Sequence, residues 1–84
     1  MLSTYIFAVT VEPMDVEDAH ARMHSECRGH GWDLRLVPVP LPSGRPAFCL
    51  ATIRAPTVGA ARFALDEALD GFEHGWLHFL GQGP

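Results

Sequence analysis

Apolar and polar positions along this chain predict the element order strand, helix, strand, strand, helix, strand. Residues 5–11 are rich in β-branched and aromatic side chains and are apolar on both alternating faces. Such a run is typical of a central strand that is covered on two sides. Residues 47–54 have the same character apart from Thr52 and Arg54, so they are predicted to be a second central strand.

The two remaining strand segments differ from these central runs. Residues 33–41 contain Pro38 and Pro40, and proline cannot donate a hydrogen bond to the ladder, so this strand should lie at an edge of the sheet. Residues 42–45 combine proline, serine and glycine and predict a hairpin turn. Residues 72–80 are predicted to be the last strand, and residues 80–84 are expected to form a flexible tail.

The first predicted helix begins at Asp15, an N-cap residue followed by negative charge in the first turn, where the helix dipole favours it. Gly29 and Gly31 should end it, because glycine readily adopts the left-handed conformation that follows a C-cap. Apolar positions at helical spacing predict its buried face, which consists of Val16, Ala19, His20, Met23 and Cys27.

The second predicted helix has Thr57 as its N-cap, and Gly71 should close it. Its expected buried stripe shares the same spacing and consists of Val58, Ala61, Leu65, Ala68 and Leu69. Phe63 falls on the opposite face of this helix, so we expect an apolar side chain that the core does not bury.

This element order resembles that of the ferredoxin-like superfold over nearly the whole chain. The resemblance implies an α+β fold, a βαββαβ plait in one domain spanning residues 1–84. Its four-stranded antiparallel sheet would have the order 4-1-3-2, with two helices on one face. Because both central strands are apolar on two faces, we expect another molecule to cover the open sheet face.

Composition narrows the possible partners. The formal net charge is −4, and the six cationic residues are all arginines spread singly along the chain. A nucleic-acid-binding protein usually carries a cationic patch, so this pattern weighs against nucleic acid. The sequence has no apolar run long enough for a membrane span and no recognisable signal peptide, which predicts a cytoplasmic protein without a membrane role. Cys27 and Cys49 are then expected to be free thiols.

A spacing of histidine and cysteine residues along the first helix suggests a transition-metal site. His20 and His24 are four residues apart, Cys27 is three further on, and His30 follows, which are ligand types that suit zinc. The alternative is that His20 borders the core, His24 is partly exposed and Cys27 is a small buried hydrophobe. We favour this alternative and therefore expect neither a metal nor another cofactor.

The last strand provides the main candidate binding residues. His74, Trp76 and His78 alternate with Leu77 and Phe79, so the two sets should point to opposite faces of the sheet. If Leu77 and Phe79 face the helices, the other three lie on the open face. Tryptophan and histidine there are typical of a recognition surface or a homodimer interface. We expect His74, Trp76, His78 and, on the helix surface, Phe63 to bind a partner.

No catalytic motif stands out, and Ser3, Ser25 and Ser43 lack the context of a nucleophilic serine. We therefore expect a small non-enzymatic protein that binds a protein partner or a second copy of itself. By analogy, compact acidic proteins of this size include regulators and inhibitors, such as the anti-CRISPR proteins of mobile elements. The alternative is a dimeric α/β-barrel enzyme of the monooxygenase or isomerase type, with a pocket between sheet and helices. A metal-binding protein is the third hypothesis.

Overall fold

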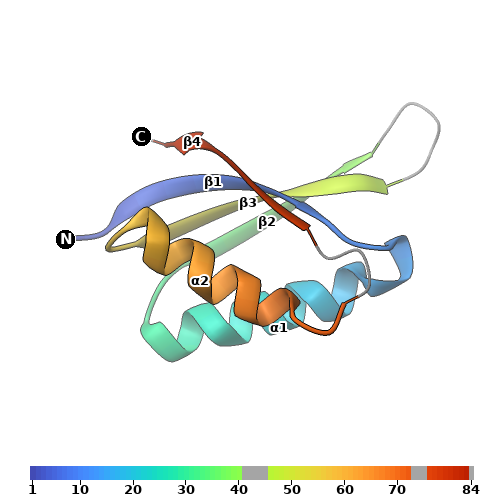
Figure 1. The fold of residues 1–84 in the computed structure, drawn as a ribbon, viewed down its shortest axis with the longest axis horizontal. Helices are drawn as coiled ribbons and strands as arrows, with labels where there is room; N and C mark the ends of the chain where they lie inside the picture. The colour runs from blue at the N-terminus through green and yellow to red at the C-terminus, as the bar shows by residue number, and fades with distance from the viewer. Residues whose placement is uncertain (41–45, 73–75, 84) are drawn as a thin grey trace.

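The computed structural model describes residues 1–40, 46–72 and 76–83 and has α+β architecture (Figure 1). Strand β1 (Ser3–Thr10) leads through a short 3-10 turn (Pro13–Asp15) into helix α1 (Val16–His30). Strands β2 (Leu34–Pro40) and β3 (Pro46–Ala55) follow, and then helix α2 (Val58–Leu69) and strand β4 (Trp76–Gln82). The predicted element order is therefore confirmed.

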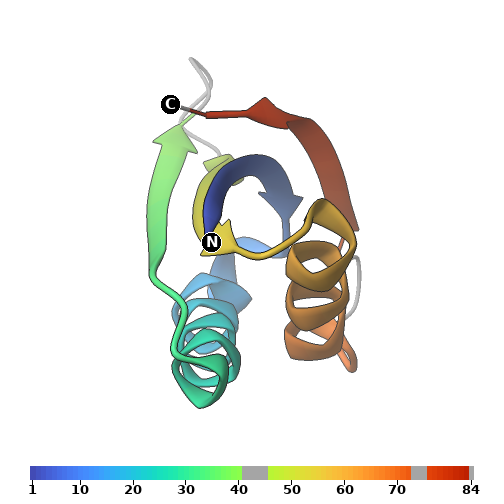
Figure 2. The same ribbon diagram turned by 90° about the vertical axis from the view of Figure 1, so that its left-hand side faces the viewer.

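The four strands form one antiparallel sheet with the order β2-β3-β1-β4, which is the predicted order. β2, which contains Pro38, lies at an edge as its prolines predict. Both helices lie side by side on the same face of the sheet, α1 beneath β2 and α2 beneath β4 (Figure 2). The expected hairpin turn at 42–45 lies outside the described residues.

The two central strands bury alternate side chains against the helices. Phe7 and Val9 of β1 and Ala51 and Ile53 of β3 are fully buried, and they share one core with Met23 of α1 and residues of α2. The intervening residues of both strands point to the other face, because successive strand side chains alternate. The pattern that looked apolar on two sides thus splits into one buried row and one open row.

The ends of α1 agree with the predicted helix in part. Asp15 occupies the N-cap position, as predicted, but its backbone is helical (φ −99°, ψ −1°) and its side chain makes no capping hydrogen bond. The preceding 3-10 turn already holds the Asp15 amide through the Glu12 carbonyl. Gly29 lies inside the helix, whereas Gly31 ends it in the left-handed conformation (φ 74°).

Helix α2 begins as predicted, because the Thr57 side chain accepts a hydrogen bond from the Ala60 amide at 3.0 Å. Its buried face differs from the prediction at two positions: Val58 is 39% exposed, and Ala64 is buried. Val58 is the first residue of α2, and Ala64 lies on the same helical face as Ala61, Leu65 and Ala68. Phe63 is 66% exposed, as expected for the outer face of this helix.

The last strand starts later and ends later than predicted. Phe72 precedes it in a turn, where its ring packs beneath the guanidinium of Arg22 at 5.1 Å. β4 continues to Gln82, and the Gly83 amide then donates to the Thr4 carbonyl. Residues 80–82, which were expected in a flexible tail, are thus part of β4, and residue 84 lies outside the described residues.

Candidate functional site

The sheet face opposite the helices, called here the open face, collects side chains from all four strands. The strand registers and the alternation of buried positions define which described residues belong to it. They are Thr4, Ile6, Ala8 and Thr10 of β1, Arg35, Val37 and Val39 of β2, Leu50, Thr52 and Arg54 of β3, and Trp76 and His78 of β4. None of these described strand residues carries a carboxylate.

An apolar row crosses the middle of the open face. Val37 pairs with Leu50, Leu50 with Ala8, and Ala8 with His78, so these four positions form one line from edge to edge. Val37 is 49% exposed, and Leu50 and Ala8 are half-buried. Contiguous apolar side chains of this kind on a folded protein commonly mark an interaction site.

An aromatic pair stands at the β4 end of this row. The rings of Trp76 and His78 stack with centroids 5.4 Å apart and planes 13° apart, and Trp76 is 55% exposed. Leu77 between them is buried on the helix side, as the alternation predicts. Phe79 also turns to that side, where its ring contacts Phe7 at 5.2 Å. The stacked pair is thus available to a partner and unnecessary to the core.

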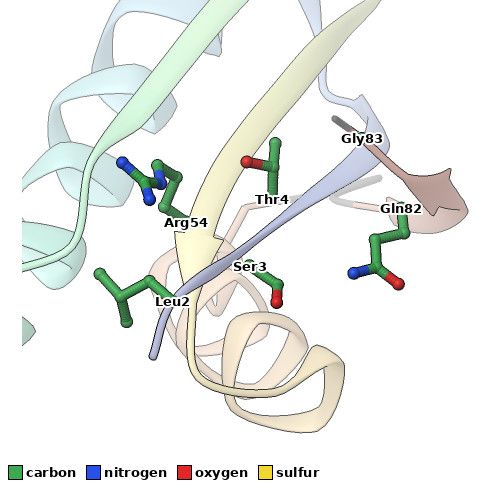
Figure 3. Close-up of a pocket in the computed structure, with 6 residues that line it drawn as sticks. All are labelled: Leu2, Ser3, Thr4, Arg54, Gln82 and Gly83. Carbon is green, nitrogen blue, oxygen red and sulfur yellow. The ribbon is translucent and has the colours of Figure 1, made fainter.

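The end of the open face nearest the chain termini is polar and hollowed. One hollow of about 410 Å³ is lined by Leu2, Ser3, Thr4, Arg54, Gln82 and Gly83 (Figure 3). Thr4 and Arg54 point to one side of their strands there, and Ser3 and Gln82 point to the other. A second hollow of about 450 Å³ adjoins it through the same Thr4 and Arg54 and adds Asp33, Leu34, Arg35 and Thr52.

Two arginines determine the charge of this polar end. Arg35 pairs with Thr52 across β2 and β3, and Arg54 follows two residues later on the same face. Asp33 lies at the rim, but among the described residues no ion pair joins it to either arginine. Two guanidinium groups against one carboxylate leave this end cationic within an acidic protein.

The structure separates the predicted partner-binding residues. Trp76 and His78 lie together on the open face, His74 lies outside the described residues, and Phe63 projects from α2 on the helix side of the molecule. Phe63 therefore cannot belong to the same contact surface as Trp76.

The four proposed metal ligands do not converge. The rings of His20 and His24 lie 4.6 Å apart, but Cys27 is buried in the core and His30 stacks on Trp32 at 4.4 Å. Across residues 1–40, 46–72 and 76–83 no group of three or more such side chains is arranged to hold an ion. The alternative reading, with His20 half-buried and His24 exposed, describes their places.

The two cysteines are buried free thiols in the described structure. Burial raises the pKa of the Cys27 thiol to about 11, and the neighbouring Glu26 carboxylate adds to this rise. Burial also raises the pKa of the Cys49 thiol. Neither thiol is therefore suited to act as a nucleophile at neutral pH.

The cationic end was not among the residues predicted from the sequence to bind a partner. Its signal was present, because Thr52 and Arg54 were the only polar exceptions in the 47–54 run and Arg35 interrupts the apolar pattern of the neighbouring strand. Only the register between β2 and β3 brings the two arginines onto one face.

None of the helices in the described part of the chain is both long and apolar enough to span a membrane. No protein-family model matches the chain, and comparison with curated proteins and with solved structures also returns no match.

Proposed function

We propose that this chain is a small non-enzymatic module that binds a protein partner through the open face of its sheet. The supporting observation is the exposed Trp76–His78 stack on β4, at the end of an apolar row that crosses β2, β3 and β1. Aromatic residues of this kind are enriched at the energetic centre of protein interfaces. The fold itself is proposed to be ferredoxin-like, on the basis of strand order and of two helices on one face.

The open face supports binding better than it supports catalysis in a closed pocket. The enzyme alternative needs a cavity between sheet and helices, yet Phe7, Met23, Ile53 and Leu65 fill that space and are fully buried. A binding module of this kind acts by occupying a surface of its partner, which is how inhibitors and regulators of similar size work. We therefore propose a regulatory or inhibitory role.

The test places a photoreactive benzoylphenylalanine at one of two exposed apolar positions, Val37 on the open face or Phe63 on α2. Each variant is irradiated in lysate of the cells that encode the protein, and products are resolved by mass. A discrete product from position 37 that position 63 does not give supports the proposal. A product from position 63 alone would move the binding surface to the helices and overturn it.

The same experiment separates a second copy from another protein. Light scattering of the purified chain over a range of concentrations gives its oligomeric state. A position-37 product of twice the monomer mass, together with a dimer in light scattering, identifies a homodimer. A product of any other mass from a monomeric chain identifies a different protein partner.

A further inference from the structure

The cationic end of the open face has chemistry that the apolar row lacks. We propose that this end, formed by Arg35, Arg54, Thr4 and Thr52, binds carboxylate side chains of an acidic segment in the partner protein. This inference rests on the proposed function, because it states the chemistry of the partner that the open face receives.

The two arginines are placed to act together. Arg35 lies opposite Thr52, and Arg54 lies two residues further along β3, so the two positions are diagonal neighbours on one face. Diagonal neighbours across antiparallel strands are about 7–8 Å apart, within reach of two long side chains. Both side chains are exposed, and neither guanidinium makes a hydrogen bond or ion pair with another described residue, although the Arg54 backbone amide donates to the Asp33 carbonyl.

Hydroxyl groups complete the donor set. Thr4 lies in both hollows with Arg54, and Thr52 lies in the hollow with Arg35. A guanidinium presents a planar fork of N–H donors that matches a carboxylate, and a threonine hydroxyl can donate a further hydrogen bond. Two adjoining hollows that share Thr4 and Arg54 provide space for a pair of carboxylates.

The charge of the open face favours an acidic protein segment over a second copy of this chain or a nucleic acid. A second copy would bring the same cationic end and, among its described strand residues, a face with no carboxylate to meet it. A nucleic acid presents a row of phosphates that needs many cations, whereas this face has two arginines on a chain of net charge −4. An acidic protein segment can carry a few carboxylates close together, which two arginines suffice to bind. The same segment can also have apolar side chains that contact the apolar row.

The size of the face defines the segment further. Thr4 at the cationic end and Thr10, which pairs with Trp76, are six residues apart on β1, and a strand rises about 3.3 Å per residue. The cationic end and the Trp76–His78 stack are therefore roughly 20 Å apart. The inferred segment has its carboxylates at one end and apolar or aromatic side chains at the other, so that both ends of the face are covered.

The probe is a capped peptide with a glutamate pair at one end and leucine, valine and tryptophan at the other. Matched peptides carry glutamine or lysine in place of glutamate. Binding is followed by amide shifts in two-dimensional NMR spectra, with the protein variants Arg35→Gln/Arg54→Gln and Arg62→Gln. Arg62 is a suitable control, because it is an exposed arginine on α2 and not on the open face. Its Nε lies 3.7 Å from Asp66 Oδ2.

We expect saturable shifts at Thr52 and Arg54 with the glutamate peptide. Replacing both arginines should weaken this binding at least about tenfold, as should replacing glutamate by glutamine, because each change removes charge-assisted hydrogen bonds. Arg62→Gln should bind like the unchanged protein. Absence of saturable shifts, or equal binding by the glutamine or lysine peptide, overturns the inference. Tighter binding of a short single-stranded uridine oligonucleotide also overturns it.

Two experimental outcomes distinguish an incorrect carboxylate site from an incorrect protein-binding function. If position 37 crosslinks a partner whose binding is unchanged in Arg35→Gln/Arg54→Gln, the open face binds protein but the carboxylate site is wrong. If the glutamate peptide binds through the two arginines but position 37 gives no product, the carboxylate site stands and the protein-binding function is wrong.

Discussion

The indole ring of Trp76 stacks on the imidazole ring of His78, with the ring centroids 5.4 Å apart and the planes 13° apart, on the face of β4 that the helices do not cover. The residue between them, Leu77, is buried. Leu77 is thus part of the core, whereas its two neighbours lie on the open face. Because of this separation, the proposed contribution of Trp76 to binding can be measured without loss of the fold.

Trp76→Ala should weaken partner binding by about 2 kcal/mol or more, which is typical of a tryptophan that acts as a hot spot in a protein interface. Its effect on the free energy of unfolding should stay near or below about 1 kcal/mol, because more than half of the side chain is already exposed. A melting curve and a binding constant for the crosslinked partner measure the two effects. Lost stability with unchanged binding would show that Trp76 belongs to the core.

Leu65→Asp should unfold the protein, whereas Phe63→Asp on the same helix should not. Leu65 is fully buried, and Phe63 is 66% exposed. Burying an unpaired carboxylate costs several kcal/mol, a large part of the stability of so small a domain. Circular dichroism melts of the two variants provide the comparison. Equal melting temperatures would contradict the assigned faces of α2.

Arg22→Gln should destabilise the fold by about 1 kcal/mol. The Arg22 guanidinium donates to the Asp70 carbonyl at 3.0 Å and lies 5.1 Å above the Phe72 ring, so it joins α1 to the segment after α2. Arg62→Gln is the control, because its only described contact is a surface pair with Asp66, a kind that contributes little. Urea unfolding of both variants tests the difference. An equal loss of unfolding free energy in both variants would mean that the Arg22 contacts contribute nothing to stability.

Stability should fall at alkaline pH because of Cys27. Burial holds the pKa of its thiol at about 11 in the folded state against 9.0 for an unperturbed thiol. Between these values the unfolded chain has lost the proton and the folded chain keeps it, so the unfolded state gains stability as pH rises. The thiol should lower the free energy of unfolding by about 1 kcal/mol between pH 8 and pH 10.

The free energy of unfolding is measured against pH for the unmodified protein and for Cys27→Ala. The change with pH isolates the effect of the thiol, because the stability lost to the cavity in the variant is the same at both pH values. The variant should lose less stability than the unmodified protein between these two pH values. Identical slopes for the two proteins would exclude the thiol as their cause.

Local patterns in the sequence determined the elements and most of their faces. Helix α2 shows this clearly: the Thr57 cap and the spacing of Ala61, Leu65 and Ala68 are local signals, and the structure contains both. Proline placed β2 at an edge for an equally local reason, the missing donor. Two details were not evident from local signals. The Asp15 side chain makes no capping hydrogen bond after the 3-10 turn, and pairing with β1 extends β4 to Gln82.

The tertiary structure alone decided which distant side chains meet. The sequence showed Arg35 and Arg54 as isolated cations, and the β2–β3 register makes them neighbours. It also showed His20, His24, Cys27 and His30 at the spacing of metal ligands, and core packing turns Cys27 away from the others. Periodicity along a chain reports which face a residue occupies, because that depends on local geometry. Which residues share the face depends on strand register and packing, which are set by contacts between segments far apart in sequence.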